Sequence, residues 1–107
     1  MDVKKVIKIE KQRSFLRSAI NEVLEDSEVT YSHYIVMCAI LELKNCTPSI
    51  VSKTIGYKPA IISRLLDLLE KQSLVVRKHS KMDRRAVYVD VTPKGKKLVN
   101  NILAAIS

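Results

Sequence analysis

The fold of this chain is decided by Thr47–Pro93, which reads TPSIVSKTIGYKPAIISRLLDLLEKQSLVVRKHSKMDRRAVYVDVTP. A Thr-Pro pair, typical of a helix start, opens this stretch, and Gly56 is typical of a helix end. Pro59 can begin a second helix, whose leucine-rich run leads into two β-rich segments, Leu74–Arg77 and Ala86–Val91. Two helices across a tight turn, followed by a charged hairpin, predict a winged helix-turn-helix, a fold suited to binding duplex DNA.

Hydrophobic periodicity and cap residues predict helices over about 3–25, 31–43, 48–55, 59–72 and 93–105. Thr30 and Thr92 are the expected N-caps of the second and the last helix. The first helix is long for so small a chain, and we expect part of it to pack against something outside the domain. The expected fold class is mostly α with a small β-hairpin wing, in the order α-α-α-α-β-β-α.

We expect a single domain over residues 1–107, because a chain of this length builds one core of modest size. The helix-turn-helix and wing would occupy 47–91. The N-terminal helix within 1–28 and the last helix at 93–106 are candidate dimerisation elements.

The positive charge is concentrated in the helix-turn-helix and the hairpin. The chain carries 19 lysines and arginines against 11 aspartates and glutamates, a net charge of +8. Residues 44–85 have 10 basic and 3 acidic side chains, a net charge of +7, whereas residues 1–43 have a net charge of −1. Such an excess fits a nucleic acid or an anionic membrane surface as partner. Its placement favours nucleic acid.

Three features bear on the cellular compartment. No stretch approaches the roughly 18 continuous apolar residues of a membrane span. The first residues lack the apolar core of a signal peptide. The two cysteines are too few for a disulfide framework. We therefore expect a cytoplasmic protein with no membrane partner.

The segment Ser63–Val99 closely resembles the multiple-antibiotic-resistance regulator (MarR) family. Its marks are a leucine-rich helix that ends in Leu69–Lys71, the hairpin motif Asp83–Ala86, and the following Val91–Lys96, which reads VTPKGK. The resemblance extends over roughly residues 29–100. It implies a dimeric transcription regulator that binds a short palindrome, often as a repressor.

The resemblance also implies which elements meet DNA. The recognition helix, about 59–72, would enter the major groove, and the wing, 77–86, would lie at the minor groove. Arg85 would be the minor-groove residue, with Arg84 beside it. The sequence departs from the family pattern in two places. Ser73 replaces a glycine usual in the family, so we expect a different backbone in that turn. The chain also stops at Ser107, before the long C-terminal helix that normally completes the dimer.

The chemistry of individual residues gives a candidate DNA-binding set: Ser49, Lys53, Lys58, Pro59, Ala60, Ser63, Arg64, Lys78, Lys81, Arg84 and Arg85. Arg64 could pair with guanine O6 and N7, a contact worth about 1–3 kcal/mol of discrimination. A phosphate clamp or a solvated arginine is the alternative. The start of the recognition helix presents backbone N–H groups to phosphate. Ser49 and Lys53 are more suited to backbone than to base contacts.

The wing residues have two interpretations. Arg84 or Arg85 could insert into a narrow, electronegative minor groove. In the competing interpretation, Arg85 pairs with Asp83 and fixes the hairpin turn. Lys78 and Lys81 are expected to contact phosphates nonspecifically, which makes affinity fall steeply with salt.

The sequence indicates redox, metal or enzyme chemistry less strongly than DNA binding. Cys46, which we expect in a loop beside Lys44, is a redox candidate, although a plain structural cysteine is the stronger interpretation. We expect no metal, because the spacing of the histidines and cysteines matches no familiar ligand pair. We expect no cofactor and no enzyme, since two glycines cannot form a Gly-rich phosphate loop.

The sequence therefore predicts a homodimeric, sequence-specific regulator that binds a pseudo-palindromic double-stranded DNA site, and the family resemblance implies a repressor. A plasmid or phage replication or partition protein is one alternative, and it would bind clustered repeats. A protein-interaction adaptor that has lost DNA binding is the other, but it would not need the +7 of residues 44–85. The sequence does not identify a small-molecule effector.

Overall fold

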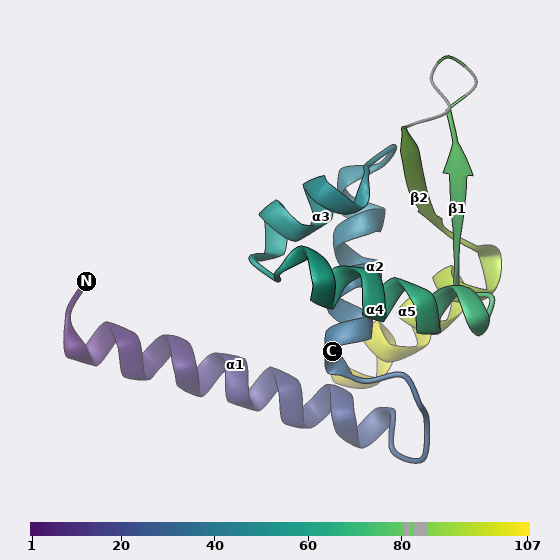
Figure 1. Ribbon diagram of the computed structural model, residues 1–107. Helices are drawn as coiled ribbons and strands as arrows, with labels where there is room; N and C mark the ends of the chain where they lie inside the picture. The colour runs from purple at the N-terminus through teal and green to yellow at the C-terminus, as the bar shows by residue number, and fades with distance from the viewer. Residues whose placement is uncertain (81, 83–85) are drawn as a thin grey trace.

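Five helices and a two-stranded antiparallel sheet make up the computed structural model, which describes residues 1–80, 82 and 86–107 (Figure 1). The elements are α1 (Val3–Val23), α2 (Tyr31–Leu43), α3 (Pro48–Ile55), α4 (Pro59–Lys71), β1 (Val75–His79), β2 (Val87–Val91) and α5 (Pro93–Ile106). The winged helix-turn-helix order expected from the sequence is confirmed. No helix within the described residues is both long enough and apolar enough to cross a membrane.

Threonine side chains begin the helices as the sequence predicts. The Thr47 hydroxyl accepts from the N–H of Ile50 at 3.3 Å, and the Thr92 hydroxyl accepts from the N–H of Gly95 at 3.0 Å. At the start of α2, the N–H of Thr30 donates to Nδ1 of His33 at 2.9 Å, in the manner of a capping box. These local bonds explain why the predicted helix bounds agree with the structure to within two residues.

Helix α2 lies at the centre of the core and contacts α1, α3, α4, α5 and β2. The buried side chains of the core come from α2 itself and from α3, α4, both strands and α5, with Ile20 added from α1. They include Val36, Met37, Ile40, Val51, Ile62, Leu66, Leu69, Val75, Val89, Val99 and Ile102. One apolar core thus holds the helix-turn-helix, the hairpin and α5 together.

The hairpin pairs Val75 with Val91 at its base and His79 with Val87 near its tip. As the alternating pattern predicts, Val89 and Val91 are buried and Asp90 is exposed. The loop before α3 adds a bridge to this sheet, because the N–H of Val89 donates to the carbonyl of Cys46 at 2.9 Å. The hairpin extends beyond the helices (Figure 1).

The turn after α4 corrects one expectation. Ser73 replaces the family's glycine, yet its φ is +61°, so the serine adopts the left-handed conformation that glycine favours. The Thr92 hydroxyl donates to the Ser73 carbonyl at 2.6 Å, and Lys94 Nζ donates to the Gln72 carbonyl at 2.9 Å. The start of α5 therefore holds this turn in place without the glycine.

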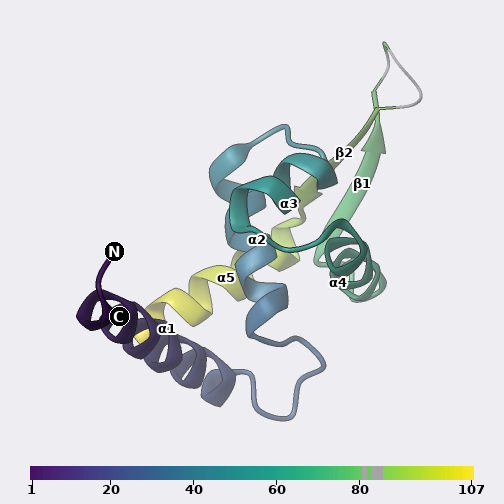
Figure 2. The ribbon, with the colours of Figure 1, turned by 60° about the vertical axis from the view of Figure 1, so that its left-hand side comes forward.

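Helix α1 projects away from the core (Figures 1 and 2). Ile20 is its only buried residue, and most of its apolar side chains lie in solvent. The exposed ones are Val3, Val6, Ile7, Ile9, Phe15, Leu16 and Val23. Part of this helix is thus left without a partner among the described residues, and its packing against something outside the domain stays a prediction.

Candidate nucleic-acid interface

The start of α3, one side of α4 and the hairpin enclose a hollow of about 460 Å³. Its lining comprises Pro48, Ser49, Pro59, Ser63, Leu66, Asp67, Arg77 and Val87. Three residues of the candidate DNA-binding set, Ser49, Pro59 and Ser63, are therefore brought together although they lie in two helices. Lys53 is exposed on the next turn of α3.

Helix α4 separates its apolar and polar residues sharply. Its buried side is formed by Ile62, Leu66 and Leu69. The exposed residues at its start include all the predicted ones, Lys58, Pro59, Ala60, Ser63 and Arg64, together with Ile61. Within residues 1–80, 82 and 86–107, neither Lys58 nor Arg64 forms an ion pair. Both cations are thus available to an external anion, and Lys58 stands at the end of the helix where the dipole is positive.

The turn between α3 and α4 is set by two residues. Gly56 has φ +76°, the left-handed conformation that ends α3. The hydroxyl of Ser52, which is buried, donates to the carbonyl of Tyr57. Sequence reasoning missed Ser52, and only its place on the apolar side of a short helix hints at a structural role. This bond fixes how α4 is presented relative to α3.

Lys78 is exposed on β1, where its Nζ lies 4.0 Å from a carboxylate oxygen of Asp90. An exposed ion pair at this distance contributes little, so Lys78 can exchange Asp90 for a phosphate. The remaining wing residues of the candidate set, Lys81, Arg84 and Arg85, lie outside the described residues, as does Asp83.

Arg77 is a residue that sequence reasoning missed. Its Nη1 lies 3.0 Å from Asp67 Oδ1 and 3.2 Å from Glu70 Oε2, and its Nη2 lies 3.5 Å from the Ser63 carbonyl oxygen. One arginine of β1 thus connects the hairpin to three residues of α4. The available signal was weak: two acidic residues about one turn apart on α4, with an arginine in the following strand.

The environment of Cys46 overturns the premise of the redox hypothesis. Its side chain is 1% exposed, because the bridge to β2 brings it into the core. Burial raises the pKa of the Cys46 thiol, which disfavours the reactive thiolate. Burial likewise raises the pKa of Cys38, which is partly buried on α2.

Comparison with known proteins finds transcriptional regulators that are similar to this chain in sequence. The family model of the transcriptional regulator SarA/Rot matches residues 18–102. An uncharacterised HTH-type transcriptional regulator, YhbI of Bacillus subtilis (strain 168), is 32% identical over 77 residues, or 72% of this chain and 50% of that protein. The chain therefore spans half the length of this relative.

Solved structures share the fold. The apo form of wild-type MarR from E. coli aligns with a TM-score of 0.83 at 22% identity, covering 100% of this chain and 78% of that one. A variant of the same protein in complex with operator DNA aligns with a TM-score of 0.77 at 21% identity, covering 100% and 80%. At these identities, the likeness concerns the fold alone. Because the family model covers most of the chain, and the fold is the MarR-type winged helix, the chain belongs to the SarA/Rot family of transcriptional regulators.

Proposed function

We propose that this protein is a sequence-specific regulator that binds double-stranded DNA as a homodimer, on a pseudo-palindromic site, and acts as a repressor. The observation that carries the proposal is the start of α4, where the exposed Lys58, Ser63 and Arg64 stand on a rigid, core-packed helix beside the hairpin. This is the surface that a winged helix-turn-helix needs for a major groove.

In this proposal, α4 is the recognition helix. Arg64 reads a base edge, because a guanidinium can donate two parallel hydrogen bonds to guanine. Lys58 and the backbone N–H groups at the start of α4 hold a phosphate, and Ser49 and Lys53 of α3 contact the neighbouring backbone. These contacts fix the register in which Arg64 meets the bases.

The hairpin supplies the second contact. Lys78 lies on its exposed side and would bind phosphate. We assign Arg85 to the minor groove, with Arg84 beside it, on the resemblance of Asp83–Ala86 to the MarR family, and Lys81 to a nonspecific phosphate contact. The solved complex of a MarR variant with operator DNA supports DNA as the partner.

The homodimer is proposed from α1 and α5. Val6, Ile9, Leu16 and Val23 recur at steps of three and seven residues, a spacing typical of a helix that packs along another helix. A further hollow of about 380 Å³ between α1 and α5 is lined by Phe15, Ala19, Glu22, Val23, Ala105 and Ile106. A second copy that covers these surfaces would place two recognition helices on one duplex.

A repressor role, from the family resemblance, and a cytoplasmic location, from the small number of cysteines, complete the proposal. A solved structure described as the multiple antibiotic resistance repressor, MarR, aligns with a TM-score of 0.77 at 24% identity, over 95% of this chain and 72% of that one. A repressor of this kind occupies its site and excludes other proteins from it.

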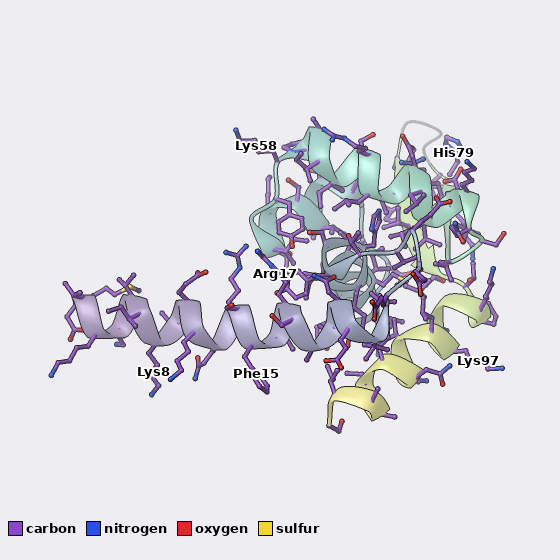
Figure 3. All side chains as sticks on the ribbon, turned by 90° about the horizontal axis from the view of Figure 1, so that it is seen from below. Lys8, Phe15, Arg17, Lys58, His79 and Lys97 are labelled. Atoms are coloured by element: carbon purple, nitrogen blue, oxygen red, sulfur yellow. The ribbon has the colours of Figure 1, made fainter. Side chains whose placement is uncertain are left out.

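The test is selection of bound fragments from randomised duplex DNA at two salt concentrations, with wild type, Arg64→Ala and Arg85→Ala. We expect a two-fold motif in which Arg64→Ala loses preference at one position per half-site, while Arg85→Ala reduces preference for A·T-rich flanks. Lys97→Ala is the matched control, because Lys97 lies on α5, away from Lys58 and α4 (Figure 3). Clustered direct repeats would instead indicate a replication or partition protein, and absence of any salt-sensitive binding would indicate an adaptor.

A further inference from the structure

The recognition helix carries two acidic side chains close to its proposed DNA-binding residues. Asp67 lies one turn after Ser63, and Glu70 lies almost one turn further. Their side chains are 67% and 46% exposed. A carboxylate beside a phosphate backbone is repelled by it, so these residues oppose the binding that the rest of α4 favours.

Arg77 lies between these carboxylates and the hairpin. Its Nη1 reaches both acids, at 3.0 Å and 3.2 Å, while its own side chain is only 28% exposed. The Nη2 group is directed to the Ser63 carbonyl oxygen. The guanidinium is therefore occupied within the protein on both terminal nitrogens, whereas Arg64 forms no ion pair with any residue that the structure describes.

We propose that Arg77 is a positioning residue for DNA binding, which acts through Asp67 and Glu70 by neutralising their charge rather than by contacting DNA. This inference rests on the proposed function. Charge-assisted bonds to both carboxylates orient their negative oxygens toward the hairpin and reduce the repulsion that a phosphate experiences at α4. A lysine could not do the same, because a single ammonium lacks the planar fork of arginine.

The test is a double-mutant cycle on duplex affinity. Arg77→Ala is made in the wild-type chain and in a chain that carries Asp67→Asn and Glu70→Gln, and affinity is measured against the selected DNA site at several salt concentrations. We expect Arg77→Ala to weaken binding about tenfold in the wild-type chain, and less than about threefold where the carboxylates are already amides. We expect Arg77→Lys to fall between wild type and Arg77→Ala.

Two controls make the result specific. Lys78→Ala removes a proposed phosphate contact, so its salt slope should fall by about one in either background. Lys97→Ala removes a cation from α5 and should leave affinity unchanged. Thermal unfolding of every variant identifies losses that come from misfolding. The Asp67→Asn, Glu70→Gln chain needs no change at Arg77, and it should bind DNA at least as tightly as wild type.

An equal cost of Arg77→Ala in both backgrounds, with a salt slope reduced as in Lys78→Ala, would overturn the inference and make Arg77 a direct DNA contact. Weaker binding by the Asp67→Asn, Glu70→Gln chain would also overturn it. Both results leave the proposed function standing. Failure of the wild type to bind duplex DNA would remove the proposed function, and the inference with it.

Discussion

Helices α1 and α4 both carry basic and apolar side chains, yet they expose different kinds of surface. Helix α4 buries Ile62, Leu66 and Leu69 to 1% exposure or less and turns its polar residues outward. Helix α1 leaves Phe15 at 77% exposure and buries only Ile20. Figure 3 shows Phe15 pointing away from the side that carries Lys58. The difference teaches that α4 buries one apolar side within a single chain and exposes charge, whereas α1 exposes an apolar surface that a second copy can cover.

The largest expected effect comes from placing a charge on the apolar surface of α1. Phe15→Glu should weaken the proposed dimer by more than about 3 kcal/mol, because burying each phenylalanine is worth about 1.5–3 kcal/mol and a two-fold interface buries two. Sedimentation equilibrium measures the loss, and affinity for a two-fold DNA site should fall with it. The fold should persist, since Phe15 contributes little to the core of one chain.

A matched substitution on α4 sharpens the contrast. Ile61 is a similarly apolar residue, 37% exposed, on the proposed recognition helix α4. Ile61→Glu should weaken DNA binding through charge repulsion but leave the oligomeric state unchanged. A monomeric Ile61→Glu, or a dimeric Phe15→Glu, would show that the two helices have been assigned the wrong roles.

The next effect concerns how rigidly the α4 and hairpin region is joined to α5. A Cβ added at Gly95 would lie 2.2 Å from the Leu74 carbonyl oxygen and 2.6 Å from Val91 Cγ1. Gly95→Ala should therefore lower the free energy of unfolding by about 2–3 kcal/mol, the usual cost of overpacking. Chemical denaturation measures this loss.

Gly56→Ala provides the control for Gly95→Ala. No atom lies within 4 Å of a Cβ built at Gly56, but its φ of +76° strains any side chain. The expected loss is smaller, about 1 kcal/mol. If Gly56→Ala lowered the free energy of unfolding more than Gly95→Ala, close packing around Gly95 would not be the main link between α5 and the hairpin.

The sequence predicted the helices well because their ends are encoded locally. Thr47 and Thr92 cap helices with side-chain bonds to residues three positions on, and Gly56 ends a helix by its own backbone freedom. The exposed start of α4 follows from its apolar period. Such features need no knowledge of the rest of the chain.

Arg77 shows where sequence reasoning fails, and Cys46 shows where it left two interpretations open. Arg77 meets Asp67 and Glu70 only because the hairpin folds back along α4, so their pairing is not visible in local spacing. Cys46 stands beside polar residues typical of a loop, yet Val89, which is 43 positions away, pairs with its backbone and buries it. Both cases depend on tertiary contacts that override the local pattern.

Helix α2 contacts both α1 and α4, and the stability at its start should depend on pH. At the start of α2, Nδ1 of His33 accepts the N–H of Thr30, so protonation removes this bond. Burial lowers the pKa of His33 from 6.5. The unfolded chain therefore binds this proton more readily, and the free energy of unfolding should fall below about pH 6.5, by at most about 1.4 kcal/mol per pH unit.

Urea denaturation between pH 5 and 8 measures this dependence, with His33→Gln as the control. Glutamine can accept the same N–H in a capping box but does not titrate in this range. We expect the variant to lose the His33 contribution to the slope while keeping wild-type stability near pH 8. An unchanged slope in His33→Gln would assign the pH dependence to other groups.

The smallest expected effect is that of a serine-to-glycine change, which should stabilise the turn after α4 and destabilise α1. Ser73 has φ +61° after α4, and its carbonyl still accepts from the Thr92 hydroxyl when the side chain is removed. Ser73→Gly relieves the left-handed strain and should raise the free energy of unfolding by about 0.5 kcal/mol, after the entropy cost of glycine. The same change at Ser18, exposed within α1, should lower it by about 0.5 kcal/mol, because glycine disfavours a helix interior. Denaturation of both variants in parallel measures the difference. If both were destabilising, the Ser73 side chain would have to make a contribution larger than the strain it imposes.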